Sequence, residues 1–356
     1  MDLRPTADQR ALQSGTRELL ARRFGRDRLR AAVEHPALDR ALWRELGAAG
    51  FFALRLPEAD GGVGLGLPEA VLVFEEAGRA LLPGPLVAGQ LLAGVVPGVA
   101  EGERVVGLCE VGSYGMGPYE MGAYEVGAGG GGLWEHPGDC DELILIEGGV
   151  AGGPGADAYG GVSGAAYGDA CGRAYWNDPG WPVQEPVCSI DPLTPLARVT
   201  SYPRRAPRSL DVPRLRREAA LLTAALQLGS AARTVEMAVE HAGRREQFGV
   251  RIGSFQAVKH LCAEMLIRVE IARSAVYAAS LVDQSLAVVG AKLLADEAAV
   301  RNARDCLQVH GGMGFTWEAD VHLHLKRAWL RVEQWQSRPN AEEVLAEALL
   351  TGNVGV

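Results

Sequence analysis

The sequence lacks the patterns that mark metal-binding, disulfide-stapled, secreted and membrane-spanning proteins. Its six cysteines form no C-x-x-C pair and no His-x-x-x-His pattern lies near them, so we expect no metal site. Six cysteines in 356 residues are too few for a disulfide scaffold, which favours reduced thiols in a cytosol. No run of about 18 apolar residues is present, and the first residues lack the apolar core of a signal peptide. We therefore expect a cytoplasmic protein with no membrane span.

Positive charge is also scarce. The net charge of −9 argues against a nucleic-acid partner held by overall electrostatic attraction. The negative charge is concentrated in residues 101–170, which contain twelve acidic side chains and one basic side chain, Arg104. The remaining residues sum to about +2, so the acidity belongs to one segment and says little about partners of the whole chain.

The acidic segment also contains 21 of the 46 glycines and five of the eight tyrosines. A five-residue repeat places Tyr114, Tyr119 and Tyr124 at a spacing that matches neither a helix nor a strand face. Glycine resists ordering, so the repeat predicts an expanded surface loop. A tyrosine-bearing contact segment for a partner is the alternative.

Hydrophobic periodicity predicts three domains: a helical domain over 1–103, a β-rich domain over 104–207 and a helical bundle over 208–356. Buried strands are expected at 105–109 and 142–146. The bundle helices are expected at about 211–242, with a gentle break at Gly229, and at 254–280, 285–309, 321–335 and 341–350. The fold class is therefore α+β and mostly α.

Three segments resemble the acyl-CoA dehydrogenase family. They are residues 46–79, residues 245–260 with R-E-Q-F-G followed by I-G-S-F-Q-A-V-K-H, and residues 307–318 with L-Q-V-H-G-G-M-G-F-T-W-E. The resemblance extends over roughly 35–100 and 210–335, and it implies a helical N-terminal domain, a reduced central β-domain and a C-terminal four-helix bundle. The T-W-E ending and the compact middle resemble actinobacterial members, some of which pair as unlike subunits in fatty-acid or steroid side-chain degradation.

The resemblance implies FAD as cofactor and the oxidation of an acyl-CoA thioester to its 2,3-enoyl form. In the family, a glutamate removes the α-proton and the flavin accepts the β-hydride. The arginine that matches Arg245 reaches the flavin pyrophosphate of a neighbouring subunit, where its guanidinium can fork onto two phosphate oxygens. The matched cofactor-binding positions are Arg245, Phe248, Gln256, Gln308, Gly311 and Gly312.

The sequence departs from the family pattern at the catalytic base and in the middle domain. The position about twenty residues after Phe315 is Trp335, and Glu333 comes two residues early. The family's alternative position aligns with Ala219, one residue from Glu218, and one residue turns a helical side chain by about 100°. The catalytic residue is therefore unknown, with Glu218 and Glu333 as candidates. The middle domain also lacks the family's flavin-covering loop and Trp-Ile-Thr strand.

Three functions fit these observations. The first is a dehydrogenase subunit that completes the FAD site of an unlike partner, with acyl-CoA as substrate. The second is a self-sufficient homo-oligomeric dehydrogenase with a relocated glutamate base. The third is a non-catalytic binding or scaffold protein that uses the tyrosine repeat.

Overall fold

A computed structural model describes residues 4–111, 132–147, 173–176, 183–201, 210–282 and 284–352. The tyrosine repeat at 112–131 and most of the second glycine-rich stretch lie outside the described residues. The first part of the chain is helical, as the sequence predicts. Its helices are α1 (Ala7–Arg23), α2 (Arg26–Glu34), α3 (Arg40–Ala48), α4 (Leu67–Arg79) and α5 (Leu86–Leu92), with a 3₁₀ turn at Glu58–Asp60.

Two small sheets follow the N-terminal helices. One has the order β1-β3-β4 and the other the order β2-β6-β5. The strands are β1 (Val106–Val111), β2 (Leu133–Glu135), β3 (Glu142–Glu147), β4 (Arg173–Trp176), β5 (Val183–Val187) and β6 (Leu196–Ser201). Both strands expected from the sequence are confirmed, and they pair in parallel with Val106 opposite Glu142. Their apolar side chains, such as Ile144, are fully buried.

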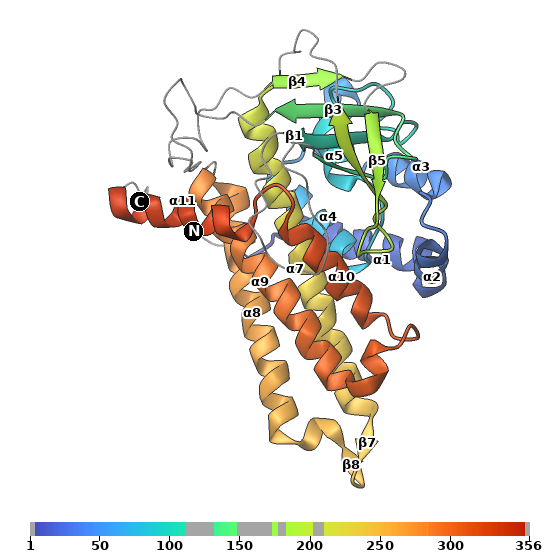
Figure 1. Ribbon diagram of the computed structural model, residues 1–356, viewed down its shortest axis with the longest axis vertical. Helices are drawn as coiled ribbons and strands as arrows, with labels where there is room; N and C mark the ends of the chain where they lie inside the picture. The colour runs from blue at the N-terminus through green and yellow to red at the C-terminus, as the bar shows by residue number, and fades with distance from the viewer. Residues whose placement is uncertain are drawn as a thin grey trace.

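The C-terminal part is a bundle of long helices that extends away from the sheets (Figure 1). Its elements are α7 (Val212–Arg244), the hairpin β7 (Glu246–Gln247) and β8 (Val250–Arg251), α8 (Gln256–Leu281), α9 (Ser285–His310), a 3₁₀ turn (Gly311–Phe315), α10 (Val321–Val332) and α11 (Arg338–Thr351). None of the helices in the described ranges has an apolar stretch long enough to cross a bilayer.

The expected break at Gly229 is wrong, because α7 is continuous from Val212 to Arg244. Gly229 lies where α4 crosses α7, and a Cβ built there would stand 1.8 Å from the carbonyl oxygen of Glu75. Gly78 on α4 faces α7 in the same way, with its would-be Cβ 2.0 Å from the Leu226 oxygen. The two glycines therefore allow the helix backbones to touch, which periodicity along one helix cannot reveal.

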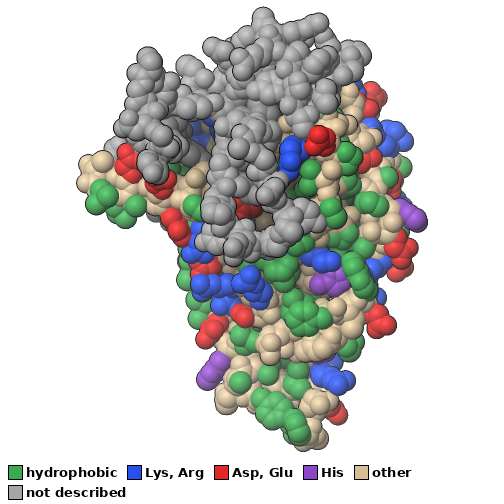
Figure 2. All heavy atoms as spheres, in the orientation of Figure 1, with side chains coloured by type: hydrophobic (Ala, Val, Ile, Leu, Met, Phe, Trp, Pro, Cys, Tyr) green, Lys and Arg blue, Asp and Glu red, His purple; other side chains and the backbone are tan. Residues whose placement is uncertain are grey.

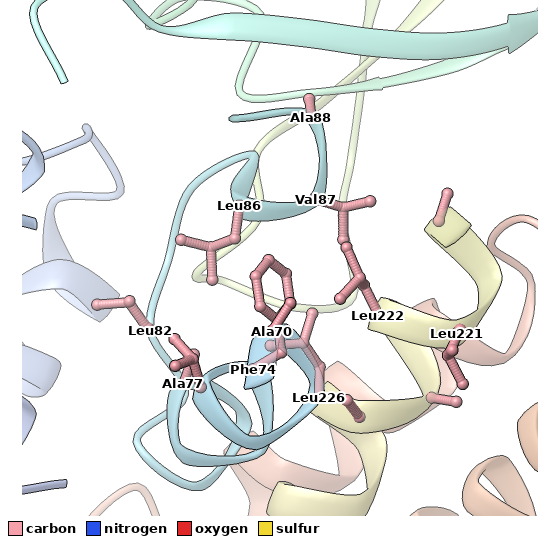
Figure 3. Close-up of a cluster of buried hydrophobic side chains, with 14 of the residues drawn as sticks. Ala70, Phe74, Ala77, Leu82, Leu86, Val87, Ala88, Leu221, Leu222 and Leu226 are labelled. Carbon is pink, nitrogen blue, oxygen red and sulfur yellow. The ribbon is translucent and has the colours of Figure 1, made fainter. Parts of the chain in front are cut away.

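Apolar side chains of α4, α5 and α7 meet beside this crossing (Figure 3). Phe74 is fully buried and lies among Leu86, Val87, Leu222 and Leu226 in the main hydrophobic core. This core joins the N-terminal helices to the bundle. Burying each such side chain contributes about 1.5–3 kcal/mol to folding.

The expected helix over 321–335 is too long at its C-terminus. The structure ends α10 at Val332, and residues 333–337 form a turn before α11. Within that turn Trp335 has a φ of +62°, which a helix does not allow.

Candidate cofactor-contact site

The six predicted cofactor residues lie at the end of the bundle farthest from the sheets (Figure 1). They belong to two segments, which we call the bundle tip: residues 245–256, from the end of α7 to the start of α8, and residues 308–317, from the last turn of α9 into the loop that follows. All six residues are exposed. They are Arg245, Phe248, Gln256, Gln308, Gly311 and Gly312. Hydrophobic side chains are visible at this end of the molecule (Figure 2).

The first loop begins where α7 ends. The backbone N–H of Arg245 donates to the carbonyl oxygen of His241 at 2.8 Å and closes the helix. The chain then forms the β7–β8 hairpin, whose two-residue turn is Phe248-Gly249. Both turn residues have positive φ, +54° for Phe248 and +78° for Gly249, as a type I′ turn requires. The turn projects Phe248 into solvent, where 93% of the residue is exposed.

The second loop begins where α9 ends at His310. Gly311 has φ +62° and ψ −144°, a region that only glycine adopts readily. A Cβ added at Gly311 or Gly312 would meet no atom within 4 Å, so the backbone of this loop faces open space. A phosphate group can therefore approach the loop closely, which fits the contact that the family resemblance implies for these glycines.

A pair of stacked histidines joins the two loops. The rings of His241 on α7 and His310 on α9 lie 4.1 Å apart at 27°. The Nδ1 atom of His310 is 2.8 Å from the carbonyl oxygen of Cys306. Burial, followed by the charges of His310 and Arg245, lowers the pKa of His241, which favours its neutral form. The stacked histidines thus place the end of α7, just before the predicted residue Arg245, beside the end of α9, which carries the predicted residue Gln308.

The second loop carries exposed apolar side chains. Met313 is 53% exposed, Phe315 75% and Trp317 62%. The cation of Lys326 lies 4.3 Å from the centre of the Trp317 ring. With Phe248, these side chains give the bundle tip an apolar surface of the kind that marks a contact with another molecule.

The two candidate bases have opposite surroundings. Burial disfavours the charged form of Glu218, but its hydrogen bonds to Arg55 at 2.7 and 2.8 Å, together with one from Arg214 at 2.8 Å, hold its pKa below its usual range. A carboxylate clamped in this way is a weak proton acceptor. Glu333 differs, because partial loss of hydration raises its pKa, although the residue as a whole stays exposed.

Glu333 lines a cavity of about 50 Å³ between the sheets and the bundle. Its walls are formed by residues of α5, β1, β2, β6, the end of α10 and the α10–α11 turn, including Glu110, Arg331 and Trp335. Burial lowers the pKa of Arg331 to about 10. None of the six predicted cofactor residues lines this cavity. Counting from Phe315 leads to Trp335, but no pattern in the sequence indicates the positive φ of its backbone. Among the described residues, no three His, Cys, Asp or Glu side chains gather to hold a metal.

Fold and bundle tip together define an acyl-CoA dehydrogenase architecture, and comparison with known families agrees. The family model "Acyl-CoA dehydrogenase, N-terminal domain" matches residues 6–99, and "Acyl-CoA dehydrogenase, C-terminal domain" matches residues 215–333. The acyl-CoA dehydrogenase IpdE2 of Mycobacterium tuberculosis is 33% identical over 91% of this chain and 92% of its own. This chain therefore belongs to the acyl-CoA dehydrogenase family of FAD-dependent oxidoreductases.

A further relative is similar in sequence, and two solved structures have the same fold. The acyl-CoA dehydrogenase FadE34 of M. tuberculosis is 35% identical over 81% of this chain and 39% of its own length. The solved ChsE4-ChsE5 complex from M. tuberculosis superposes with a TM-score of 0.79 at 23% identity, over 98% of this chain and 99% of the matched one. The Tcur3481-Tcur3483 steroid ACAD G363A variant gives a TM-score of 0.77 at 22% identity, over 98% and 99%.

Proposed function

We propose that this chain is one subunit of a hetero-oligomeric acyl-CoA dehydrogenase and that its bundle tip completes the FAD site of an unlike partner subunit. The observation that carries the proposal is the exposure of the six cofactor residues, above all Phe248, at the free end of the bundle. A phenylalanine held in solvent by a strained turn contributes almost nothing to this chain's own core. It gains free energy only when a partner covers it.

The residues of the tip suit the cofactor. Arg245 can hold two phosphate oxygens of the flavin pyrophosphate, and Gly311 and Gly312 leave room for a phosphate beside the backbone. Gln256 and Gln308 offer amide groups, and Phe248 offers an apolar face. When bound, FAD supplies the hydride-accepting chemistry, whereas this chain positions the dinucleotide.

An unlike partner is favoured because this chain offers no suitable base at the usual positions. Trp335 stands where the family resemblance leads one to expect a glutamate, and Glu218 is tied to Arg55 and Arg214. The partner then supplies the base. The substrate we propose is the CoA thioester of a fatty acid or a steroid side chain, in line with the steroid ACAD named above. We further propose a heterotetramer that acts in β-oxidation in the cytoplasm.

The test compares the chain purified alone with the chain purified together with the dehydrogenase encoded beside it. We expect the lone chain to be colourless and the complex to carry FAD and oxidise acyl-CoA. Arg245→Ala should strip flavin from the complex, whereas Arg244→Ala, one residue earlier and also exposed, should leave it bound. A lone chain with stoichiometric flavin and dehydrogenase activity would refute the proposal.

The second candidate is a homo-oligomer in which Glu333 is the base. Its raised pKa and its place in the cavity wall favour this function. Glu333→Gln would then abolish activity while flavin content stayed the same, and Glu218→Gln would retain activity. Full turnover by Glu333→Gln would eliminate this candidate. Deleting residues 112–131, which lie outside the described residues, tests the scaffold alternative, since partner association should then be lost.

A further inference from the structure

One large side chain, Trp335, lines the cavity between the sheets and the bundle. Eight of its thirteen lining residues are apolar, among them Val87 from α5, Leu108 from β1 and Leu330 from α10. The other five are polar or charged: Glu110, Glu135, Arg331, Glu333 and Gln334. Trp335, from the turn between α10 and α11, is the largest side chain in the wall. A small cavity at the junction of the N-terminal helices, the sheets and the bundle is the kind of place where enzymes hold small apolar ligands.

Trp335 has a backbone conformation that a tryptophan adopts only at a cost. Its φ of +62° lies in the left-handed region, which costs about 1–2 kcal/mol for a residue with a Cβ. Glycine would take the same conformation without that cost. Packing of the indole must therefore offset the backbone cost. The indole is partly buried and packs against the main core.

The turn around Trp335 is held on both sides. The backbone N–H of Gln336 donates to the Gln334 carbonyl oxygen at 2.7 Å, and the side chain of Gln334 donates to the carboxylate of Glu135 on β2. The first bond holds the turn together, and the second ties it to the sheet. A strained residue persists only where its surroundings hold it in this way.

The remaining space is too small for an acyl chain. An engineered apolar cavity of about 150 Å³ holds a benzene ring, whereas this one measures about 50 Å³. We infer that Trp335 plugs an apolar, acyl-sized pocket in this chain and keeps it closed. The inference rests on the proposed function, because a subunit that works on its partner's flavin has no use for a substrate pocket of its own.

The test is a calorimetric titration of the lone chain with decanoyl-CoA, and free CoA serves as the ligand control. Trp335→Gly removes the indole and relieves the backbone, and Trp335→Leu keeps part of the packing if the glycine variant is poorly folded. The matched control is Trp329→Ala, which truncates an indole of α10 that packs on the second, smaller core and does not line the cavity.

We expect each folded Trp335 variant to bind decanoyl-CoA at least tenfold more tightly than the wild type, with free CoA unchanged. Trp329→Ala should bind like the wild type. The plug is overturned if the wild type already binds as tightly as the variants, if folded Trp335 variants show no gain, or if Trp329→Ala gains equally. The titration uses neither partner nor flavin. A negative result would therefore refute the plug without bearing on the comparison of the lone chain with the complex, which tests the proposed function.

Discussion

Replacing Phe248 by asparagine should change the stability of the lone chain and its affinity for a partner in opposite directions. The hairpin turn needs positive φ at Phe248 and Gly249, and Asn-Gly is the sequence that type I′ turns prefer. Asparagine adopts the left-handed region more readily than phenylalanine because its short side chain hydrogen-bonds locally. The substitution therefore relieves strain and leaves the hairpin register intact.

The magnitude follows from exposure. The left-handed conformation costs a bulky residue about 1–2 kcal/mol, most of which asparagine recovers. Phe248 is 93% exposed, so its removal forfeits almost no buried area. It does forfeit an edge-to-face contact with Phe255, whose ring centre is 6.4 Å away, worth at most about 0.5 kcal/mol at such an exposed site. The lone chain should gain about 0.5–1 kcal/mol.

The complex should lose more than the lone chain gains. Burying a phenylalanine contributes about 1.5–3 kcal/mol, and each 1.4 kcal/mol is a factor of ten in the dissociation constant. We therefore expect the partner complex to weaken by roughly 10- to 100-fold and to lose flavin in parallel.

Urea unfolding of the lone chain, amide exchange of the hairpin and titration of the partner measure both effects. Gly249→Ala is the matched control, because it strains the same turn at φ +78° and should lower both stability and affinity. Lower stability of the lone Phe248→Asn chain would show that the ring belongs to this chain's own structure. Unchanged affinity would remove Phe248 from the interface.

Three further predictions concern the stability of the fold around α7. Gly229→Ala should cost about 3 kcal/mol in urea unfolding, because its Cβ would stand 1.8 Å from the Glu75 carbonyl oxygen, and an unchanged midpoint would contradict the close crossing of α4 and α7. Glu218→Gln should cost about 2 kcal/mol through its lost ionic hydrogen bonds with Arg55 while the complex keeps its activity; abolished activity at full stability would restore Glu218 as a base. In the folded chain, hydrogen bonds with arginines outweigh burial and lower the pKa values of Glu218 and Glu236. The stability from both groups is therefore present above their unfolded pKa, about 4.3, and is lost as pH falls through the lower folded values. The melting temperature should drop across this range, and Glu218→Gln should drop less steeply; equal slopes would contradict the assignment.

The sequence alone predicted the local parts of the fold well. The bundle helices and the strands at 105–109 and 142–146 follow from periodicity within a short window, and the structure confirms them to within a few residues, except at the end of α10. The motif at 307–318 also located the loop after α9, because the Gly311-Gly312 pair ends the helix by a backbone conformation that favours glycine. The family and its cofactor followed from such motifs and were confirmed.

Other features depend on residues far apart in the chain. Glu218 looked as good a base as Glu333 until the fold placed Arg55, 163 positions earlier, against its carboxylate. Gly229 predicts a break in the helix when the sequence is taken alone, but in the structure α4 crosses α7 there. No local pattern reports which helix or charge will come to lie beside a given side chain.

By itself the sequence determined where helices and strands form, the family and the cofactor, because hydrogen bonding along the backbone and the spacing of motif residues are local properties. Only the tertiary structure decided which residues can do chemistry. It exposed Phe248 at the bundle tip, paired Glu218 with arginines, and placed Trp335 in the cavity wall with a left-handed backbone conformation. Exposure, pKa and strained dihedral angles are set by neighbours that the folded chain brings together, and so they depend on the fold as a whole.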